Sequence, residues 1–543
     1  MNHAVYSVSR PQSQSERSYL PGSPEKETLK KELQRQYANP VEIPCIIGGK
    51  EVYTGNTIDL IMPDEKKHRL GVAHLAGEKE LEEAKKCALE AHLAWENMPD
   101  IQRFGIFLRA AELLAANPYH DIICAATILN QAKTIVQTEG DPGSGLSDII
   151  RHDVYYTSEI YREQPSSFAT SVNRIEWRPL EGFVAAITPF NYVSDAANLA
   201  IAPAVAGNTV VWKPSSTSVL SNYYVMRALM EAGLPAGVIN FVPSRGRDFS
   251  RYVIPDRNLA GIHFIGSTET FQDLWSVVGE HIRTYKNYPR LVGETGGKNF
   301  MFAYRKCSVR ALVTALIRGA FELQGQKCSA TSRAYIPASI WPEVKELLLS
   351  EIKKIKVGPA TDFTSFISAV IDQSSFNKIK GYIEGAEASA DADVLCGGCD
   401  DSVGFFVQPT VIQCHKPDYV TMTEEIFGPV LSVYVYEDEN WRETLDLVDN
   451  STAYALTGAV FCSDRYILSQ LEERLRYCAG NLYLNDKSTG SQPGYLPFGG
   501  SRASGTNDKA GSKINMMKWL NPRTIKDNLT PAEDWAYASM DEA

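Results

Sequence analysis

The sequence has 543 residues, 44% of them hydrophobic and 22% charged, a composition typical of globular proteins with two or three domains. Its net charge of −11, from 54 basic and 65 acidic side chains, argues against charge-driven binding to nucleic acid or to anionic membranes. No run approaches 18 apolar residues, so we expect no membrane-spanning helix.

Residues 1–40 are predicted to be an N-terminal extension, and the fold is expected to begin near Val41. Residues 1–15 contain no acidic side chain, include Arg10, and are rich in Ser and Gln. This composition fits a short mitochondrial leader, and it fits a disordered tail equally well. The stretch has no apolar core of the kind that a secretory signal needs.

Helices are expected first. From Glu78 to Thr134, apolar side chains recur at three- and four-residue spacing among Glu and Lys. From Gly182 onward, short apolar runs alternate with helical patterns, which indicates a parallel sheet covered by helices. The first strands are expected at residues 183–187, 210–212, 238–242 and 261–265, with a helix over 218–232.

A second block of strands follows, and with it the sequence predicts an α/β protein of two units, 41–296 and 297–490. These strands are expected at residues 299–303, 333–336, 430–436, 456–461 and 481–485, with helices over 309–323 and 341–355. Alternating polar and apolar residues over 167–177 predict a hairpin that projects from the body.

Several common chemical motifs are missing. No G-x-G-x-x-G follows a predicted strand, and residues 293–299 have the wrong spacing for a nucleoside-triphosphate loop. There is no H-E-x-x-H, and the single C-x-x-C, formed by Cys396 and Cys399, lacks a second pair or a suitably spaced His. We therefore expect no catalytic metal.

Two polar loops carry candidate chemistry. Cys328 lies between a predicted helix and a predicted strand, in a loop where Gly325 and the adjacent Lys327 could expose a thiol and favour its thiolate. Asn191 follows another strand, where it could take part in chemistry or merely cap a turn. Taken alone, each residue is more simply an inert cysteine or a turn residue.

Together, eight segments resemble the aldehyde dehydrogenase superfamily in its own order, from about Val41 to the C-terminus. The segments are Thr188-Pro-Phe-Asn191, Trp212-Lys213-Pro214-Ser215, 231–237, Phe264-Ile-Gly266-Ser267, Glu294-Thr-Gly-Gly-Lys298, Gly325-Gln-Lys-Cys328, 424–429 and 497–500. The resemblance implies a Rossmann-like NAD-binding domain (41–296), an α/β catalytic domain (297–490) and a small β oligomerisation element. That element would combine a hairpin at about 163–180 with residues 491–543, which also hold an anchor loop.

One branch of the superfamily is especially similar. Residues 485–491 (NDKSTGS) and 497–509 (PFGGSRASGTNDK) resemble the Δ1-pyrroline-5-carboxylate dehydrogenases, which oxidise L-glutamate γ-semialdehyde to L-glutamate with NAD in proline catabolism. Segments 180–186, 321–330 and 368–372 support this likeness. It implies a mitochondrial matrix enzyme in a eukaryote or a cytoplasmic one in a bacterium. It further implies a homodimer or higher oligomer, and a proline dehydrogenase as a candidate partner.

The resemblance also implies roles for individual residues. Cys328 would be the nucleophile, Glu294 the general base and Asn191 an oxyanion donor. The implied cofactor residues are Thr188, Lys213, Gly266, Ser267, Thr268, Glu269, Thr270, Glu425 and Phe427, and the implied substrate residues are Ser491, Gly490 and Ser329. Many NAD-preferring relatives carry an acid at the position of Ser216, so exclusion of NADP is not assured here.

Three alternatives stay open. The chain could be another NAD(P)-dependent semialdehyde dehydrogenase, acting on succinate or aminoadipate semialdehyde. It could be a non-catalytic binding relative, although Cys328, Glu294 and Asn191 are all present. It could also be a thiol esterase that uses the same cysteine without a dinucleotide.

Overall fold

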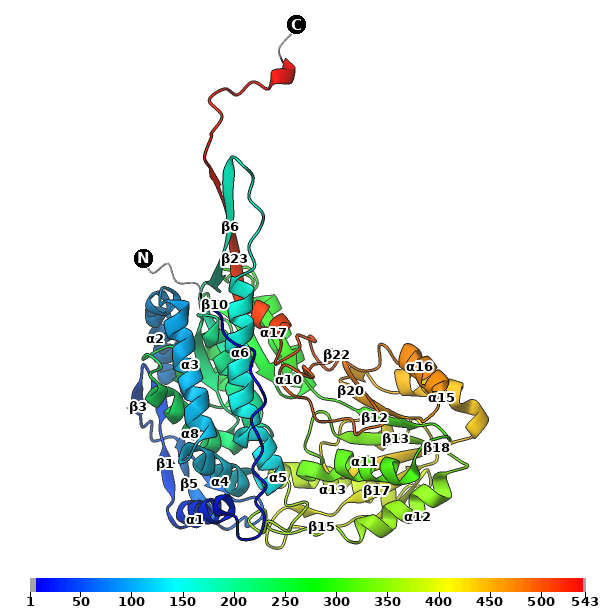
Figure 1. Ribbon diagram of the computed structural model, residues 1–543. Helices are drawn as coiled ribbons and strands as arrows, with labels where there is room; N and C mark the ends of the chain where they lie inside the picture. Colours follow the sequence, from blue (N-terminus) through cyan, green and yellow to red (C-terminus); the bar gives the residue numbers. More distant parts are fainter. Residues whose placement is uncertain (1–5, 541–543) are drawn as a thin grey trace.

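Two seven-stranded sheets organise the computed structural model, which describes residues 6–540 (Figure 1). The α/β class predicted from the sequence is confirmed. The change from one sheet to the other falls between Glu294 and Asn299. None of the helices within residues 6–540 has the length and apolarity that crossing a bilayer requires.

The first sheet is parallel over its first five strands and ends in two antiparallel ones. Its order is β11 (Arg290–Glu294), β10 (Leu259–Ile265), β7 (Phe183–Ile187), β8 (Thr209–Lys213), β9 (Ile239–Phe241), β2 (Cys45–Ile47) and β3 (Lys50–Val52). The central strands are apolar and buried along nearly their whole length, as expected when helices cover both faces of a sheet.

The helical pattern of residues 78–134 divides into three helices, because Pro99 and Pro118 interrupt it and proline cannot continue a helix interior. The helices of the first unit are α2 (Glu78–Glu96), α3 (Asp100–Ala115), α4 (Tyr119–Gln131), α5 (Ile135–Thr138), α6 (Gly145–Tyr161), α7 (Val193–Val205), α8 (Val219–Ala232), α9 (Gly246–Tyr252) and α10 (Thr268–Glu280). A π-helical turn, Glu139–Gly143, joins α5 to α6.

The second sheet is parallel except for its edge strand β14. Its order is β14 (Ala392–Cys396), β17 (Thr410–Cys414), β18 (Val430–Tyr436), β13 (Thr331–Pro337), β12 (Asn299–Ala303), β20 (Thr457–Phe461) and β21 (Asn481–Leu484). The accompanying helices are α11 (Val309–Phe321), α12 (Trp341–Ile352), α13 (Gln373–Glu387), α14 (Val420–Thr423), α15 (Trp441–Asn450) and α16 (Arg465–Arg474).

Smaller elements complete the body. They are a three-stranded sheet of β1 (Val41–Ile43), β5 (Arg69–His74) and β4 (Thr57–Ile61), the pair β15 (Cys399–Asp400) and β16 (Phe406–Val407), the pair β19 (Tyr454–Ala455) and β22 (Ser501–Arg502), and the helix α17 (Lys513–Met517).

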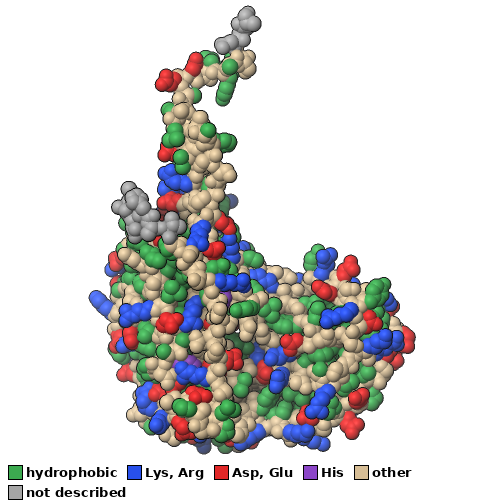
Figure 2. Space-filling model, in the orientation of Figure 1, with side chains coloured by type: hydrophobic (Ala, Val, Ile, Leu, Met, Phe, Trp, Pro, Cys, Tyr) green, Lys and Arg blue, Asp and Glu red, His purple; other side chains and the backbone are tan. Residues whose placement is uncertain are grey.

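An arm projects from the body, and its two strands come from opposite ends of the chain (Figure 1). β6 (Ser171–Pro179) pairs antiparallel with β23 (Leu520–Asn528), so the segment expected to form a local hairpin has a distant ladder partner. Residues 164–167 instead bind β6 through side chains: Gln164 Oε1 accepts the Ile175 N–H at 2.8 Å, and Ser167 Oγ accepts the Asn173 N–H at 2.9 Å. Beyond β23 the chain extends outward, with Trp535 85% exposed and hydrophobic side chains visible at its end (Figure 2).

The N-terminal region folds earlier than Val41, contrary to our expectation. The helix α1 (Pro24–Ala38) begins at Ser23, whose Oγ accepts the Lys26 N–H, and it buries Leu29 and Leu33. Only two large apolar side chains anchor this helix, so its sequence pattern is weak. Before α1, residues 6–20 run alongside α6 without regular secondary structure (Figure 1).

Candidate active site

Cys328 lies in a tight turn between α11 and β13. Leu323 and Gln324 adopt left-handed backbone angles (φ 53° and 57°), which ends α11 two residues before the predicted end. A Cβ atom on Gly325 would lie only 2.2 Å from the Gly428 carbonyl oxygen, so glycine alone allows this close approach. The turn is thus held in one conformation beneath the thiol.

Glu294 ends β11 next to Cys328, and a hydrogen bond between the thiol and the carboxyl group contributes to the pKa of each. The following segment wraps the cysteine, because Asn299 Nδ2 donates to the Cys328 carbonyl at 2.6 Å. A Cβ atom on Gly297 would lie 2.3 Å from the same carbonyl oxygen. The thiol and the carboxyl group are therefore held together by two converging loops.

The electrostatics keep this pair neutral. Burial raises the pKa of Glu294 to about 8, and the charges of Asp195 and Glu425 raise it further, against the hydrogen bond from Cys328. Burial also raises the pKa of the Cys328 thiol well above its usual range. The sequence left open that Lys327 could favour the thiolate, but its Nζ atom binds Glu322 at 2.9 Å, so its charge is already compensated. The thiol needs a base, and Glu294 is in contact with it.

Asn191 lies on the other side of the cysteine loop. Its Nδ2 atom donates to the Gln326 carbonyl at 3.0 Å, and its own carbonyl accepts the Lys133 ammonium at 2.8 Å. The Cys328 backbone N–H makes no hydrogen bond to any residue within 6–540. One amide hydrogen of Asn191 and one backbone N–H thus remain for an oxyanion.

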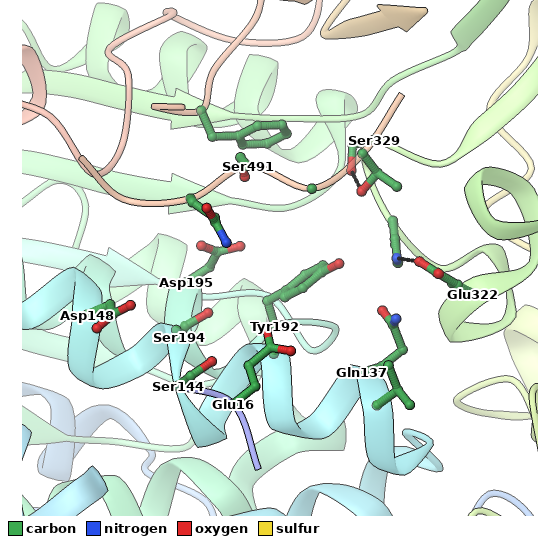
Figure 3. A pocket seen from close by; sticks show the side chains of 18 of the residues that line it. Glu16, Gln137, Ser144, Asp148, Tyr192, Ser194, Asp195, Glu322, Ser329 and Ser491 are labelled. Atoms are coloured by element: carbon green, nitrogen blue, oxygen red, sulfur yellow. Dashed lines mark hydrogen bonds and ion pairs between the residues drawn. The ribbon is translucent and has the colours of Figure 1, made fainter. Parts of the chain in front are cut away.

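A cavity of about 670 Å³ opens on Cys328 (Figure 3). Ser329, Gly490 and Ser491 line it together with the cysteine, so the three substrate residues expected from the sequence share one cavity with the expected nucleophile. The loop that carries them is tied to the cysteine loop, because Ser329 Oγ lies 2.8 Å from Thr489 Oγ1. Figure 3 shows Ser329 and Ser491 on one side of the cavity and Tyr192 opposite them.

The expected cofactor residues of the first unit share one sheet edge. Thr188, Lys213 and Gly266 stand at the carboxyl ends of the adjacent parallel strands β7, β8 and β10. Ser267 Oγ accepts the Thr270 N–H at 3.2 Å and caps α10, whose first turn contains Thr268, Glu269 and Thr270. The remaining N–H groups of this helix start suit a diphosphate.

The burial and hydrogen bonding of Lys213 indicate whether this edge fits a dinucleotide. Burial lowers its pKa to about 8, yet within residues 6–540 its Nζ atom makes only one long hydrogen bond, to the Pro214 carbonyl at 3.5 Å. A buried ammonium with spare hydrogens fits ribose hydroxyls or phosphate oxygens. The residues present therefore fit the cofactor.

Glu425 and Phe427 come from the second unit and reach this edge from across the interface. Glu425 Oε1 accepts the Gly297 N–H at 2.8 Å, and the Phe427 ring meets Phe190 edge-on, with the ring centroids 5.9 Å apart. Burial raises the pKa of Glu425. None of the nine expected cofactor residues lines the 670 Å³ cavity that the expected substrate residues share.

Comparison with known proteins decides the family. Residues 52–525 match the sequence profile described as "Aldehyde dehydrogenase family". The chain belongs to the aldehyde dehydrogenase family. It is 46% identical over 545 residues to the mitochondrial delta-1-pyrroline-5-carboxylate dehydrogenase of Dictyostelium discoideum, covering 99% of this chain and 98% of that protein. It is 46% identical over 525 residues to the human protein of the same name, covering 96% and 93%.

A solved structure agrees with these relatives. The NAD-bound delta-pyrroline-5-carboxylate dehydrogenase of Mycobacterium tuberculosis superposes on this aldehyde dehydrogenase with a TM-score of 0.96. The two chains are 44% identical, and each is covered completely. The expected aldehyde dehydrogenase-like fold is therefore confirmed.

The cavity of this aldehyde dehydrogenase also holds residues that sequence reasoning missed. Asp195 stands in the first turn of α7, where an acidic residue is common in any helix, so its sequence position gives no signal of a cavity. The other missed lining residues include Tyr192, Phe498, Glu322 and the N-terminal Ser13, Gln14 and Glu16. The N-terminal residues carry no sequence signal that points to a cavity.

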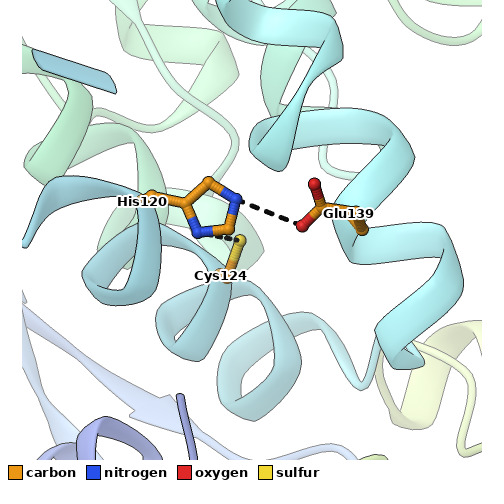
Figure 4. A group of neighbouring side chains, drawn as sticks. All are labelled: His120, Cys124 and Glu139. Carbon is orange, nitrogen blue, oxygen red and sulfur yellow. Dashed lines mark hydrogen bonds and ion pairs between the residues drawn. The ribbon is translucent and has the colours of Figure 1, made fainter. Parts of the chain in front are cut away.

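The N-terminal segment is anchored at Glu139, in the π-helical turn. Tyr19 Oη donates to Glu139 Oε2 at 2.7 Å, and the Arg17 N–H donates to Oε1 at 3.0 Å. Figure 4 shows Glu139 beside His120 and Cys124. A ring nitrogen of His120, Cys124 Sγ and a carboxylate oxygen of Glu139 all lie within 4.8 Å of one another. That spacing suits a metal ion, but the Glu139 carboxylate already binds Tyr19, Arg17 and His120, so we interpret the group as the anchor of the segment.

Proposed function

We propose that this aldehyde dehydrogenase oxidises L-glutamate γ-semialdehyde, the open form of Δ1-pyrroline-5-carboxylate, to L-glutamate with NAD, as part of proline catabolism. The observation that carries the proposal is the proximity of Cys328 and Glu294, whose side chains shift each other's pKa, at a cavity that Cys328, Gly490 and Ser491 line. The names of the similar proteins support the same substrate and cofactor.

The reaction begins with addition of Cys328 to the aldehyde carbon. The sulfur–carbon bond forms while the thiol proton passes to the Glu294 carboxylate, which is in contact with it. The carbonyl oxygen becomes an oxyanion. The free amide hydrogen of Asn191 and the Cys328 N–H would stabilise it.

The cofactor residues would hold NAD at the edge of the first sheet. Lys213 would bind the adenosine ribose, Gly266 and Ser267 with the first turn of α10 (Thr268, Glu269, Thr270) would bind the diphosphate, and Thr188 would lie along it. Glu425 would bind the nicotinamide ribose, with Phe427 beside the ring. When bound, NAD supplies the acceptor for the hydride that leaves the former aldehyde carbon.

The resulting thioester on Cys328 is hydrolysed with the help of Glu294, once the proton that Glu294 took from the thiol has passed to solvent. Its carboxylate takes a proton from water, the water oxygen attacks the thioester carbon, and the carbon–sulfur bond breaks to release L-glutamate. A carboxyl group of ordinary pKa is a weak base toward water. The raised pKa of Glu294, about 8, makes its carboxylate a stronger one at neutral pH.

Gly490 and Ser491 would bind the α-carboxylate of the substrate through backbone N–H groups and the serine hydroxyl, and Ser329 would add a contact. Ser491→Leu is expected to raise the KM for the semialdehyde by about tenfold or more, since it removes a hydroxyl and fills the space beside it. An unchanged KM would contradict this role.

The decisive experiment is NADH formation by the purified chain. Pyrroline-5-carboxylate, succinate semialdehyde and propanal are compared, each with NAD and with NADP. We expect a large preference for pyrroline-5-carboxylate with NAD. Equal activity on all three aldehydes would refute the substrate, and a preference for NADP would refute the cofactor and direct attention to Ser216.

Domain roles and assembly extend the proposal. We assign residues 41–296 to NAD binding, 297–490 to catalysis, and 163–180 with 491–543 to the anchor loop and assembly. Most residues of β23, in the arm that it forms with β6, are exposed in the single chain. A surface that contacts another subunit would be exposed in this way when the subunits are apart. Light scattering on the intact chain should give a homodimer or a larger assembly. A chain lacking residues 520–543 should then be monomeric.

Location and partner follow from the proposed reaction. The relatives named above as mitochondrial support the mitochondrial matrix as the location in a eukaryotic source, and the cytoplasm is the counterpart in a bacterium. A proline dehydrogenase supplies pyrroline-5-carboxylate and is the partner we propose. A coupled assay tests this, because docking of the two enzymes would shorten the lag before NADH appears.

A further inference from the structure

Three acidic side chains of the main body line the substrate cavity, and two of them have partners within the protein. Glu322 binds Lys327 at 2.9 Å. Both carboxylate oxygens of Asp148 accept the Gln14 N–H, at 2.9 and 3.1 Å. The third acid, Asp195, lies between Asp148 and Ser491 in the view of Figure 3.

The Asp195 carboxylate makes no hydrogen bond or ion pair within residues 6–540. The cation whose charge acts on it, Lys133, is already committed: its Nζ atom lies 2.6 Å from Asp141 Oδ2, donates to the Asn191 carbonyl at 2.8 Å, and sits 4.1 Å from the Tyr192 ring centroid. Asp195 is half-buried and lines the cavity. Burial and the charge of Asp141 raise its pKa to about 7, so a cation that enters the cavity would stabilise the carboxylate form.

The position of Asp195 is set by the start of α7. Asp141 accepts the N–H groups of Val193 and Ser194, at 2.8 and 2.9 Å, which holds the first turn of the helix in place. The charge of Asp195 raises the pKa of both Cys328 and Glu294, as a carboxylate near the reacting groups would. The side chain is thus fixed and close to the chemistry.

We infer that Asp195 binds the α-ammonium group of the substrate, while the loop containing Gly490 and Ser491 binds the α-carboxylate. This inference rests on the function proposed above, because only an aldehyde derived from an amino acid carries both charges. The two sites would together recognise the charge pattern of an α-amino acid at the far end of the aldehyde chain.

The charge of Asp195 would also disfavour aldehydes that carry a carboxylate but no ammonium group. An aldehyde that carries a carboxylate but no ammonium group brings a second negative charge toward Asp195, and like charges repel. An ammonium group on the substrate removes this repulsion and forms an ion pair in a half-buried site. Asp195 would therefore select glutamate semialdehyde against simple dicarboxylate semialdehydes.

The test compares two aldehydes of equal length in the Asp195→Asn variant. One is glutamate semialdehyde, and the other is 5-oxopentanoate, which has the same carboxylate but no ammonium group. We expect the variant to lose about 30-fold or more in kcat/KM for glutamate semialdehyde, mainly through KM, because one partner of a charge pair is gone. With 5-oxopentanoate, kcat/KM should stay the same or rise.

A binding measurement supplies a readout that does not depend on turnover. Calorimetry with L-glutamate and with glutarate should show that the wild-type chain prefers L-glutamate and that Asp195→Asn has lost this preference. Asp148→Asn is the matched control: Asp148 lines the same cavity but is bound to Gln14, so its replacement should affect both ligands alike.

Equal losses for the two aldehydes in Asp195→Asn would overturn the inference, and so would an unchanged KM for glutamate semialdehyde. NAD affinity equal to that of the wild type would show that the variant is folded. Failure of the proposed function looks different, because the wild-type chain itself would then not oxidise pyrroline-5-carboxylate.

Discussion

Lys133 and Asp141 form an ion pair with an Nζ–Oδ2 distance of 2.6 Å, and both side chains are completely buried. The pair connects two parts of the candidate site. Lys133 holds the carbonyl of Asn191, and Asp141 holds the first backbone N–H groups of α7. The position of the proposed oxyanion donor therefore depends on a salt bridge that no substrate touches.

Lys133→Met should destabilise the chain and lower kcat together. It leaves Asp141 buried without its cation, a change that typically costs about 3–5 kcal/mol. Urea denaturation and kcat at saturating substrate measure the two effects. Lys30→Met removes an exposed ion pair with Glu27 and should change stability by no more than about 0.5 kcal/mol. Wild-type stability in Lys133→Met would contradict the role of the pair.

Cys328→Ala should abolish NADH formation while NAD still binds with wild-type affinity. The variant lacks the sulfur that forms the bond to the aldehyde carbon, but it retains all nine expected cofactor residues. NAD affinity can be measured by calorimetry. Cys399→Ala, in the distant strand β15, serves as the control and should retain full activity. Retained turnover in Cys328→Ala would refute the mechanism.

The pH dependence of kcat should reflect Glu294. Its carboxylate is the active form, and a pKa of about 8 leaves only about a tenth of it deprotonated at pH 7. We therefore expect kcat to rise with pH and to level off above about pH 8, where the carboxylate predominates. Asp195→Asn removes a charge that, like the charge of Glu425, raises the pKa of Glu294, so the inflection should move to lower pH.

Glu294→Gln completes this test. It should lower kcat by a factor of about 10²–10⁴ and remove the inflection, because an amide cannot accept the proton. A wild-type kcat that is flat between about pH 6 and pH 8 would assign the base to another group.

Deleting residues 1–20 should weaken substrate binding and loosen the turn around Glu139. The deletion removes the hydrogen bonds from Tyr19 and Arg17 to Glu139 and the side chain of Gln14 from the cavity wall. We expect KM for the semialdehyde to rise and hydrogen exchange to accelerate over residues 135–150. A chain lacking only residues 1–5 is the control and should behave as the intact chain. Identical behaviour of the two truncations would show that the segment has no such role.

Buried strands were predicted well, because each is a continuous apolar run between turn residues. Phe183–Ile187, Asn299–Ala303 and Val430–Tyr436 have the boundaries expected from the sequence. The end of α11 could not be predicted in the same way. The left-handed conformation of Gln324 depends on hydrogen bonds from its side chain to Ala132 and Ala369, which are distant in sequence.

In the candidate site, too, residues in short sequence motifs could be predicted, whereas features that depend on contacts distant in sequence could not. Cys328, Glu294 and Asn191 belong to short motifs and were singled out before the structure was known. Asp195 belongs to no motif. Its importance arises from the cavity that it lines and from the pairing of the nearby Lys133 with Asp141 instead. The environment of the thiol was also left open, since the pairing of Lys327 with Glu322 depends on the turn that brings them together.

The pairing of β6 with β23 has a consequence for biosynthesis. The two strands are separated by about 340 residues, so β6 has no ladder partner until the ribosome has released the final segment of the chain. Until then β6 is an unpaired edge strand, which is prone to associate with strands of other chains. A premature stop codon near residue 520 would leave both sheets encoded, yet it would create a permanent site of aggregation on an otherwise complete body.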